Sequence, residues 1–516
     1  MTRISRRGLL TTGAAAAVLS ASGLPLRAQA KKGGRLRAGL SGANTSDSWD
    51  ARTHSDLFMI ASAQGAVFDS LTEIGADGTL KGELAESWEA SPDAKVWTFN
   101  LRSGVTFHNG KSFGADDVIE SLQMHIAEDA KSAAKPIVEP IIEMKKTGDL
   151  QVQLTLAEGN ADLPYLLSDY HILMYPAGMI EEAIAKGIGT GLYQVQSFEP
   201  GVRMVATRYA DHYKGDAAGF FDEIEYIAIN DNTARMNALM TGQVDAINRI
   251  DFKTEALLKA NPMIRIQEVT GNQHYIFPML TDVAPFDNVH VRQALKYGIN
   301  RQEMVDKILQ GHGMVGNDSP IGPANQYYLE MEQLAYDPDK AKFHLKEAGL
   351  DSLDIDLSAS SAAFEGAVDA AQLFQASAKA GGININVVQE PADGYWSNVW
   401  LKKPFCASYW SGRATEDWMF STAYAEGAPW NDSHWGSAQS ARFQELLVSA
   451  RAELDSAKRR DQYGEMQMIL RNEGGVLVPM FANYVQAISN KVANPDKVGN
   501  LWQMDNARMA ERWWMA

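Results

Sequence analysis

The side chains best suited to hold a charged solute lie close together between residues 409 and 418. Trp410 and Trp418 offer aromatic surface, Arg413 lies between them in sequence, and Glu416 and Asp417 add two carboxyl groups. A guanidinium group can hold a carboxylate or a phosphate through two parallel hydrogen bonds. The same cation can instead pair with Glu416 or Asp417, since adjacent opposite charges often satisfy each other. The stretch therefore predicts either an anion-binding group or an internal ion pair.

Residue patterns that would support catalysis or metal binding are sparse. Neither H-E-x-x-H nor C-x-x-C occurs, and we expect no serine in a G-x-S-x-G nucleophile elbow. The ten histidines are scattered, without a pair at the i,i+4 spacing of a helical metal site. Cys406 is the only cysteine, which excludes an intramolecular disulfide. We therefore expect a binding protein without metal or cofactor, with an exported hydrolase as the less favoured alternative.

Short strands and amphipathic helices alternate along the chain, which predicts a mixed α/β architecture. Alternating or apolar runs predict strands over 96–101, 150–156, 244–247 and 383–388. Helical periodicity, caps and terminal glycines predict helices over 233–242, 289–309 and 337–349, and one or two between 443 and 474.

The first thirty residues have the organisation of an export signal. Arg6 and Arg7 precede an apolar, alanine-rich run over 9–26, and Ala28-Gln29-Ala30 supplies small residues for cleavage. The run is too short and too rich in small residues to favour a membrane anchor. We predict a twin-arginine signal peptide over 1–30 and a mature, soluble chain that works in the periplasm.

The charge of the mature chain limits its partners. After residue 30 there are 43 basic and 64 acidic residues, a net charge of −21. Nucleic acids and anionic lipid surfaces both need basic patches on a protein partner. The composition therefore argues against nucleic-acid binding, and we expect contact with the membrane only through a partner protein.

Several blocks, taken in order, resemble the extracytoplasmic solute-binding proteins of peptide/nickel-type ABC importers, known as family 5. The resemblance rests on residues 83–88, 97–118, 189–193, 238–245, 285–301 and 336–349. The block 285–295, Pro-Phe-Asp-Asn-Val-His-Val-Arg-Gln-Ala-Leu, is similar to the family's PFxDxxVRxA sequence. The chain departs from the family at Leu192, where proline is usual. Each block alone is weak evidence, but together they span nearly the whole mature chain.

The resemblance implies a two-lobed periplasmic binding protein of type II, cluster C-like, in the α/β class. Lobe I would be discontinuous, formed by residues 31–275 and 485–516, and lobe II would be formed by 276–484. The chain would cross between the lobes near 271–275 and 481–484. A hinge there would let the lobes close over a ligand.

The resemblance also implies where the ligand binds. Dipeptide-binding members carry W-x-G-D in the binding loop, with the aspartate on the ligand's α-ammonium group. Here the residues are Trp410-Ser411-Gly412-Arg413, so a cation replaces the anion and an acidic ligand is expected. The predicted ligand-binding residues are Arg413, Trp410, Trp396, Tyr395, Asp417, Glu416 and Trp49. Whether the ligand is a peptide, an anionic conjugate, an opine or a sugar acid stays open.

The predicted function is that of the periplasmic substrate-binding component of an ABC importer. It would capture a peptide-like or acidic, amino-acid-derived small solute and deliver it to an ABC permease with its ATPase subunits. We expect a monomer. The alternative is a ligand-binding receptor that serves a sensor or chaperone partner.

Overall fold

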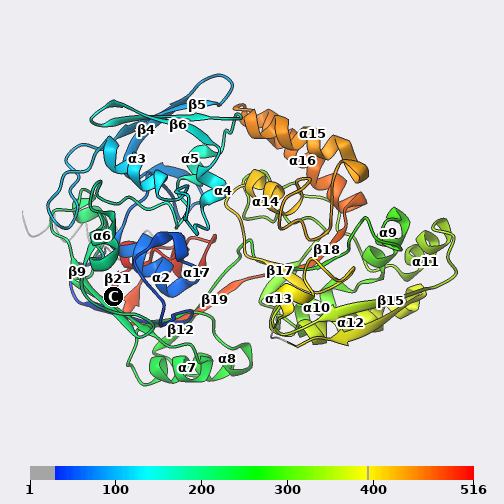
Figure 1. Ribbon diagram of the computed structural model, residues 1–516. Helices are drawn as coiled ribbons and strands as arrows, with labels where there is room; N and C mark the ends of the chain where they lie inside the picture. Colours follow the sequence, from blue (N-terminus) through cyan, green and yellow to red (C-terminus); the bar gives the residue numbers. More distant parts are fainter. Residues whose placement is uncertain (1–29, 392–393) are drawn as a thin grey trace, which may run out of the picture.

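The computed structural model describes residues 30–391 and 394–516, and the predicted signal peptide lies outside this part except for Ala30. Figure 1 shows two bodies side by side, which we call lobe I and lobe II by their central sheets. Lobe I is built on a seven-stranded sheet in the order β12-β19-β11-β1-β10-β9-β8, and lobe II on a four-stranded sheet in the order β14-β18-β13-β17.

Lobe I contains most of the first half of the chain. Its central strands are β1 (Arg35–Leu40), β8 (Tyr193–Glu199), β9 (Arg203–Arg208), β10 (Glu223–Ala228), β11 (Ala246–Ile247), β12 (Ile264–Val269) and β19 (Tyr484–Ser489). A second, antiparallel sheet contains β4 (Ala85–Ala90), β5 (Val96–Leu101), β7 (Gln151–Leu156) and β6 (Ile141–Gly148), and β2 (Thr72–Ile74) pairs with β3 (Leu80–Gly82).

The helices of lobe I come from the same segments and from the C-terminal end. They are α2 (Leu57–Ser62), α3 (Ala115–Gln123), α4 (Lys135–Val138), α5 (Leu163–Leu166), α6 (Ile180–Lys186), α7 (Asn232–Met240) and α8 (Glu255–Lys259). The chain ends in α17 (Gln503–Asn506) and α18 (Met509–Arg512), with β20 (Val492–Ala493) paired to β21 (Trp514–Met515). Residues of this last segment pack into the main core of lobe I.

Lobe II is continuous in sequence. Its sheet contains β13 (His274–Pro278), β14 (Gly313–Val315), β17 (Ser408–Trp410) and β18 (Val476–Ala482), and β15 (Leu353–Ala359) pairs in parallel with β16 (Ile383–Gln389). Its helices are α9 (Val289–Gly298), α10 (Arg301–Lys307), α11 (Pro338–Glu347), α12 (Ala367–Ala378), α13 (Tyr395–Asn398), α14 (Glu416–Ala423), α15 (Ser437–Ala452) and α16 (Ser456–Glu473).

The chain passes between the two central sheets twice. β12 of lobe I is followed by β13 of lobe II, and β18 of lobe II is followed after one residue by β19 of lobe I. The strands thus group His274 and Tyr275 with lobe II and Tyr484 with lobe I, whereas the predicted lobe boundaries lie one or two residues away, at 275/276 and 484/485. In Figure 1 the β18–β19 segment runs from one body into the other.

One predicted helix is divided in the structure. Residues 289–309 were expected to form a single helical region, but α9 ends at Gly298 and α10 begins at Arg301. The Asn300 side chain accepts a hydrogen bond from the Glu303 backbone at 3.2 Å and so caps the second helix. An N-cap residue has non-helical backbone angles, so this cap starts a new helix where periodicity alone predicts continuation.

Candidate binding site between the lobes

Arg413 comes three residues after β17 ends at Trp410, and Figure 1 shows β17 on the side of lobe II that faces lobe I. Its guanidinium carbon lies 5.4 Å from the ring centroid of Trp410 and 5.5 Å from that of Trp418. Trp418 in turn packs against the core of lobe I. A cation held against indole rings is stabilised electrostatically while it remains available to an anion.

The guanidinium of Arg413 has hydrogen-bond donors to spare. Its Nη1 donates to the Ser411 carbonyl oxygen at 3.0 Å, whereas its buried Nε has no partner. Burial lowers the pKa of Arg413 from its ordinary value, because the charged form loses hydration. Within residues 30–391 and 394–516, no carboxylate lies within ion-pair distance of this side chain.

Lobe I presents Asp169 and Tyr170 to the same region. Asp169 accepts a hydrogen bond from the His171 ring at 2.6 Å, and the Tyr170 ring lies 5.3 Å from Trp502. The Asp169 carboxylate favours the charged form of Arg413. Arg413 also lies over Trp418, which packs against the lobe I core, so the cation is at the junction of the two lobes. A ligand at Arg413 would therefore be close to groups of both lobes.

The two predicted acidic site residues have other partners than Arg413. Glu416 Oε1 accepts a hydrogen bond from the Tyr327 backbone at 2.7 Å. Asp417 accepts from Arg451 Nε at 3.0 Å and is 3 % exposed. Burial raises the pKa of Glu416 to about 7 and also raises the pKa of Asp417. The internal ion pair weighed from the sequence, Arg413 with either carboxylate, is not formed in the described residues.

The predicted aromatic residues occupy different environments. Trp410 is buried, with its indole N–H donating to Asp432 at 3.3 Å, and Tyr395 is buried with its hydroxyl donating to the Ala407 carbonyl at 2.8 Å. Trp396 is 41 % exposed. Trp49 lies in the lobe I core, 4.7 Å from the Phe198 ring. The structure thus groups Trp396 and Tyr395 near β17 and leaves Trp49 inside lobe I; their roles in ligand binding stay predictions.

Three polar residues at the crossings were not expected from the sequence. Asn272 Oδ1, His274 Nε2 and Asn483 Oδ1 are buried without a hydrogen-bond partner. Asn272 donates through its side-chain amide to the Arg413 carbonyl at 3.2 Å, and burial lowers the pKa of His274 to about 4. Buried polar atoms are usually paired, so unpaired atoms often mark functional positions. The predicted crossings at 271–275 and 481–484, which contain all three residues, were the available signal.

One motif expectation was wrong. Gly110-Lys111-Ser112-Phe113-Gly114 has the G-x-S-x-G spacing. Ser112 is exposed and forms an isolated bridge with Thr106, and α3 starts only at Ala115. A nucleophile elbow requires a sharp turn directly from a strand into a helix. The segment therefore has the sequence of an elbow without its geometry.

The one three-carboxylate group of the described residues that could hold a metal is Glu73, Glu83 and Glu511. Lys214 Nζ lies 2.7 Å from carboxylate oxygens of Glu73 and Glu511, and Arg508 Nη1 lies 2.7 Å from Glu83. Two cationic side chains thus occupy the position that an ion would take. We interpret the group as a buried ionic network of lobe I.

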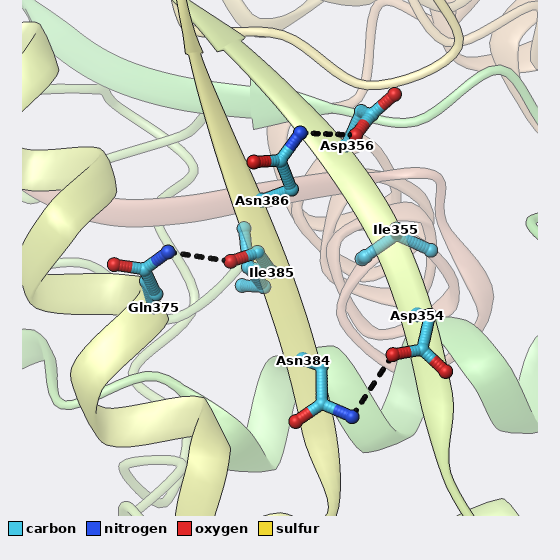
Figure 2. Close-up of a pocket in the computed structure, with 7 residues that line it drawn as sticks. All are labelled: Asp354, Ile355, Asp356, Gln375, Asn384, Ile385 and Asn386. Carbon is cyan, nitrogen blue, oxygen red and sulfur yellow. Dashed lines mark hydrogen bonds between the residues drawn. The ribbon is translucent and has the colours of Figure 1, made fainter.

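A hollow of about 390 Å³ lies along β15 and β16. Figure 2 shows the residues that line it. Asn384 donates to Asp354 at 3.0 Å, and Asn386 donates to Asp356 at 2.7 Å. These cross-strand pairs stabilise an exposed sheet face. The hollow contains none of the predicted site residues, and Figure 1 shows β15 on the far side of lobe II from lobe I. It is therefore not our candidate for the binding site.

Comparison with known proteins gives consistent results. The model of the family "Bacterial extracellular solute-binding proteins, family 5 Middle" matches residues 79–432. The dipeptide-binding protein of Escherichia coli K12 is 26 % identical over 531 residues, covering 90 % of this chain and 96 % of that protein.

Solved structures with the same fold include two ligand complexes. DppA from Helicobacter pylori, an ABC transporter-associated periplasmic binding protein in complex with the peptide STSA, has a TM-score of 0.77 at 20 % identity, covering 94 % of this chain and 99 % of that one. AgaA from A. tumefaciens R10, in complex with agropinic acid, has a TM-score of 0.76 at 22 % identity, with the same two coverages.

The chain belongs to the family 5 bacterial extracellular solute-binding proteins. The expected α/β periplasmic-binding-protein fold and the expected family are confirmed. The family is one of binding proteins, and in the part of the chain that the structure describes no helix is long and apolar enough to cross a bilayer.

Proposed function

We propose that this protein is the periplasmic binding component of an ABC importer and that it closes over a small acidic solute, peptide-like or derived from an amino acid. The acidic group of the solute would meet Arg413, and closure of lobe I onto lobe II would present the loaded form to the permease. Ligand contacts made by both lobes only when they are closed shift the equilibrium toward the closed form.

The observation that carries the proposal is the state of Arg413. This cation lies between two indole rings at the junction of the lobes, and its guanidinium is bound to backbone carbonyl oxygens rather than to a carboxylate. The chain contains 64 acidic residues, yet none of those described in the structure forms an ion pair with Arg413. Arg413 is half-buried, and its buried Nε has no partner. Because a charge that is partly removed from water is costly without a counterion, an anionic ligand is the natural partner for this one.

The relatives support a solute of this kind. The Escherichia coli relative is a dipeptide-binding protein, and the AgaA structure contains agropinic acid. A free dipeptide also carries a carboxylate, so peptides and acidic conjugates both remain ligands to test.

The test is a thermal-shift screen of the chain from Lys31, followed by titration calorimetry. The screen compares dipeptides, acidic amino-acid conjugates and sugar acids with their amides. A ligand present at about 100 times its dissociation constant should stabilise the folded state by about 2.7 kcal/mol. We expect acids to shift the melting temperature and the corresponding amides not to do so.

The Arg413 variants make this test specific. Arg413→Gln should weaken acid binding by at least tenfold, and Arg413→Lys should recover only part of it, because lysine lacks the planar pair of donors. Arg442→Gln is the matched control, since Arg442 is exposed and pairs with Glu465 at 2.8 Å on the surface. Acid binding that is unchanged in Arg413→Gln would contradict the proposed role.

We further propose that residues 1–30 direct export by the twin-arginine pathway. Replacing Arg6 and Arg7 with lysine should leave the protein in the cytoplasmic fraction. The reverse replacement at the control positions, Lys31 and Lys32 with arginine, should leave export unchanged. Import itself is tested by adding loaded protein to the reconstituted permease and measuring ATP hydrolysis.

A further inference from the structure

Five aromatic side chains of lobe II, three of them exposed, form two groups of contacting rings near Arg413, which together we call the aromatic shelf: Trp396, Trp400 and Tyr409 in one group, and Trp410 and Trp430 in the other. The Trp396 ring lies 5.6 Å from Trp400 and 5.8 Å from Tyr409, and the Trp430 ring lies 6.2 Å from Trp410. Trp396, Tyr409 and Trp430 are 41, 39 and 50 % exposed. Grouped exposed aromatic rings often mark a binding surface.

Asp432 joins the two halves of the shelf. Its Oδ2 accepts hydrogen bonds from the indole N–H groups of Trp400 at 3.2 Å and Trp410 at 3.3 Å. The carboxyl group is 2 % exposed, and its second oxygen has no partner. An indole has a single donor, so this one oxygen sets the orientation of both rings. Trp396 packs on one of these rings and Trp430 on the other.

The shelf is continuous with the anion site. Arg413 lies over Trp410, one of the two indoles that Asp432 holds. β17 and α13, which carry Trp410 and Trp396, lie on the side of lobe II toward lobe I in Figure 1. A ligand whose acidic group reaches Arg413 therefore has aromatic surface next to it.

We propose that the aromatic shelf binds a ring of the ligand, that the ligand is a ring-bearing carboxylic acid, and that Asp432 is the positioning residue of the shelf. The proposal rests on the function proposed above. Aromatic and pyranose rings share the required chemistry, a flat face of C–H or π surface, and both pack well on tryptophan and tyrosine. Asp432 does not touch the ligand; it acts through Trp400 and Trp410.

Titration calorimetry with matched probes tests the shelf. Phenylacetate and glucuronate carry a ring and a carboxylate, butanoate and gluconate carry only the carboxylate, and phenylacetamide carries only the ring. We expect the ring-bearing acids to bind at least tenfold more tightly than the ring-free acids. Trp396→Ala and Trp430→Ala should each reduce this preference by threefold or more and leave the ring-free acids within twofold. Phe343→Ala, at a 55 % exposed ring on α11, is the control and should change nothing.

Asp432 is tested by a conservative and a disruptive variant. Asp432→Asn keeps an oxygen acceptor for the indoles and should retain the preference for rings, whereas Asp432→Leu should lose it. Tryptophan fluorescence, recorded without ligand, should shift in Asp432→Leu and not in Asp432→Asn. A general loss of structure would weaken the binding of ring-bearing and ring-free acids equally. The ratio of the affinity for ring-bearing acids to that for ring-free acids therefore reports whether Asp432 positions the rings of the shelf.

The outcomes separate the two proposals. If acids bind through Arg413 but the shelf variants leave the ring preference unchanged, the shelf proposal is overturned and the proposed function stands. If phenylacetamide quenches tryptophan fluorescence in a Trp396-dependent way while no acid is preferred over its amide, the shelf binds rings and the anion role of Arg413 fails. If the affinity of every ring-bearing probe is independent of Trp396 and Trp430, the shelf does not bind a ring of the ligand and the shelf proposal is overturned.

Discussion

The burial of Glu416 at the start of a helix makes the stability of the folded state depend on pH. It occupies the first turn of α14, where an acid is favourable, but it is 1 % exposed, and burial raises its pKa to about 7. The folded state therefore binds the proton more tightly than the unfolded state does. The resulting stability is complete below about pH 4, is lost as the pH rises toward 7, and stays lost above that.

We predict that Glu416→Gln raises the free energy of unfolding at pH 8 and leaves it almost unchanged at pH 4. The gain at pH 8 should be on the order of 1–3 kcal/mol, because glutamine can still accept the bond from Tyr327 without the desolvated charge. Chemical denaturation at both pH values measures it. Glu445→Gln, at an exposed position, is the control; an equal gain there, or no gain at Glu416, would contradict the argument.

The residues of the site differ in how far the sequence could identify them. Arg413 and Trp410 stand in one short motif, so a local pattern was enough to select them. Tyr170, Asn272 and Asp432 reach the same region from distant segments, and only the fold brings them there. The partners of Glu416 and Asp417, Tyr327 and Arg451, are likewise distant in sequence.

At the scale of elements, the C-terminal segment is attached to lobe I by charge. Arg508, just before α18, contacts Glu83 at 2.7 Å, Glu511 at 2.7 Å and Glu73 at 3.2 Å, and it is 3 % exposed. Lys214 shares these three carboxylates. Removing Arg508 would leave three buried or half-buried carboxylates with Lys214 as their one remaining cation in this network, which compensates their charge only in part.

We predict that Arg508→Met lowers the free energy of unfolding by about 3–5 kcal/mol at neutral pH. Denaturant unfolding followed by circular dichroism measures the loss. Arg442→Met removes an exposed ion pair and should cost at most about 1 kcal/mol. Losses of similar size in the two variants would mean that the network does not hold the C-terminal segment.

Elements set by local signals were predicted well. The alternating run 96–101 is β5 with the same bounds, and the run 383–388 is β16 except for its last residue. The division of 289–309 into α9 and α10 was missed, because the Asn300 cap interrupts a helical period that continues on both sides. Crossing points between sheets depend on strand pairing over hundreds of residues, so local patterns cannot locate them, and the predicted crossings rest on the resemblance alone.

At the scale of the whole molecule, the two lobes are joined away from the crossings by a buried ion pair. Arg459 Nη2 of α16 contacts Asp162 Oδ1 of lobe I at 2.7 Å, with side chains 8 and 2 % exposed. The Ala161 backbone N–H also donates to the Arg451 carbonyl at 2.7 Å. Opening of the lobes would break both contacts, so they favour the closed arrangement.

We predict that Asp162→Asn shifts the ligand-free protein toward the open form. The radius of gyration from small-angle X-ray scattering should increase, and ligand affinity should fall several-fold, because ligand must then supply more of the free energy of closure. Glu182→Gln breaks an exposed pair within α6 and should alter neither quantity. Identical scattering from Asp162→Asn and the native protein would show that the pair does not hold the lobes together.

The position of β19 has a consequence for the order in which the molecule is made. β19 lies between β12 and β11, one strand in from the edge of the lobe I sheet, yet it begins at Tyr484, 215 residues after β12 ends at Val269. At roughly 5–20 residues per second, a ribosome needs about 10–40 s to bridge that interval. During that time the nascent sheet has unpaired strand edges, which invite misassociation. Lobe I, although begun first, can be completed only after lobe II has been synthesised.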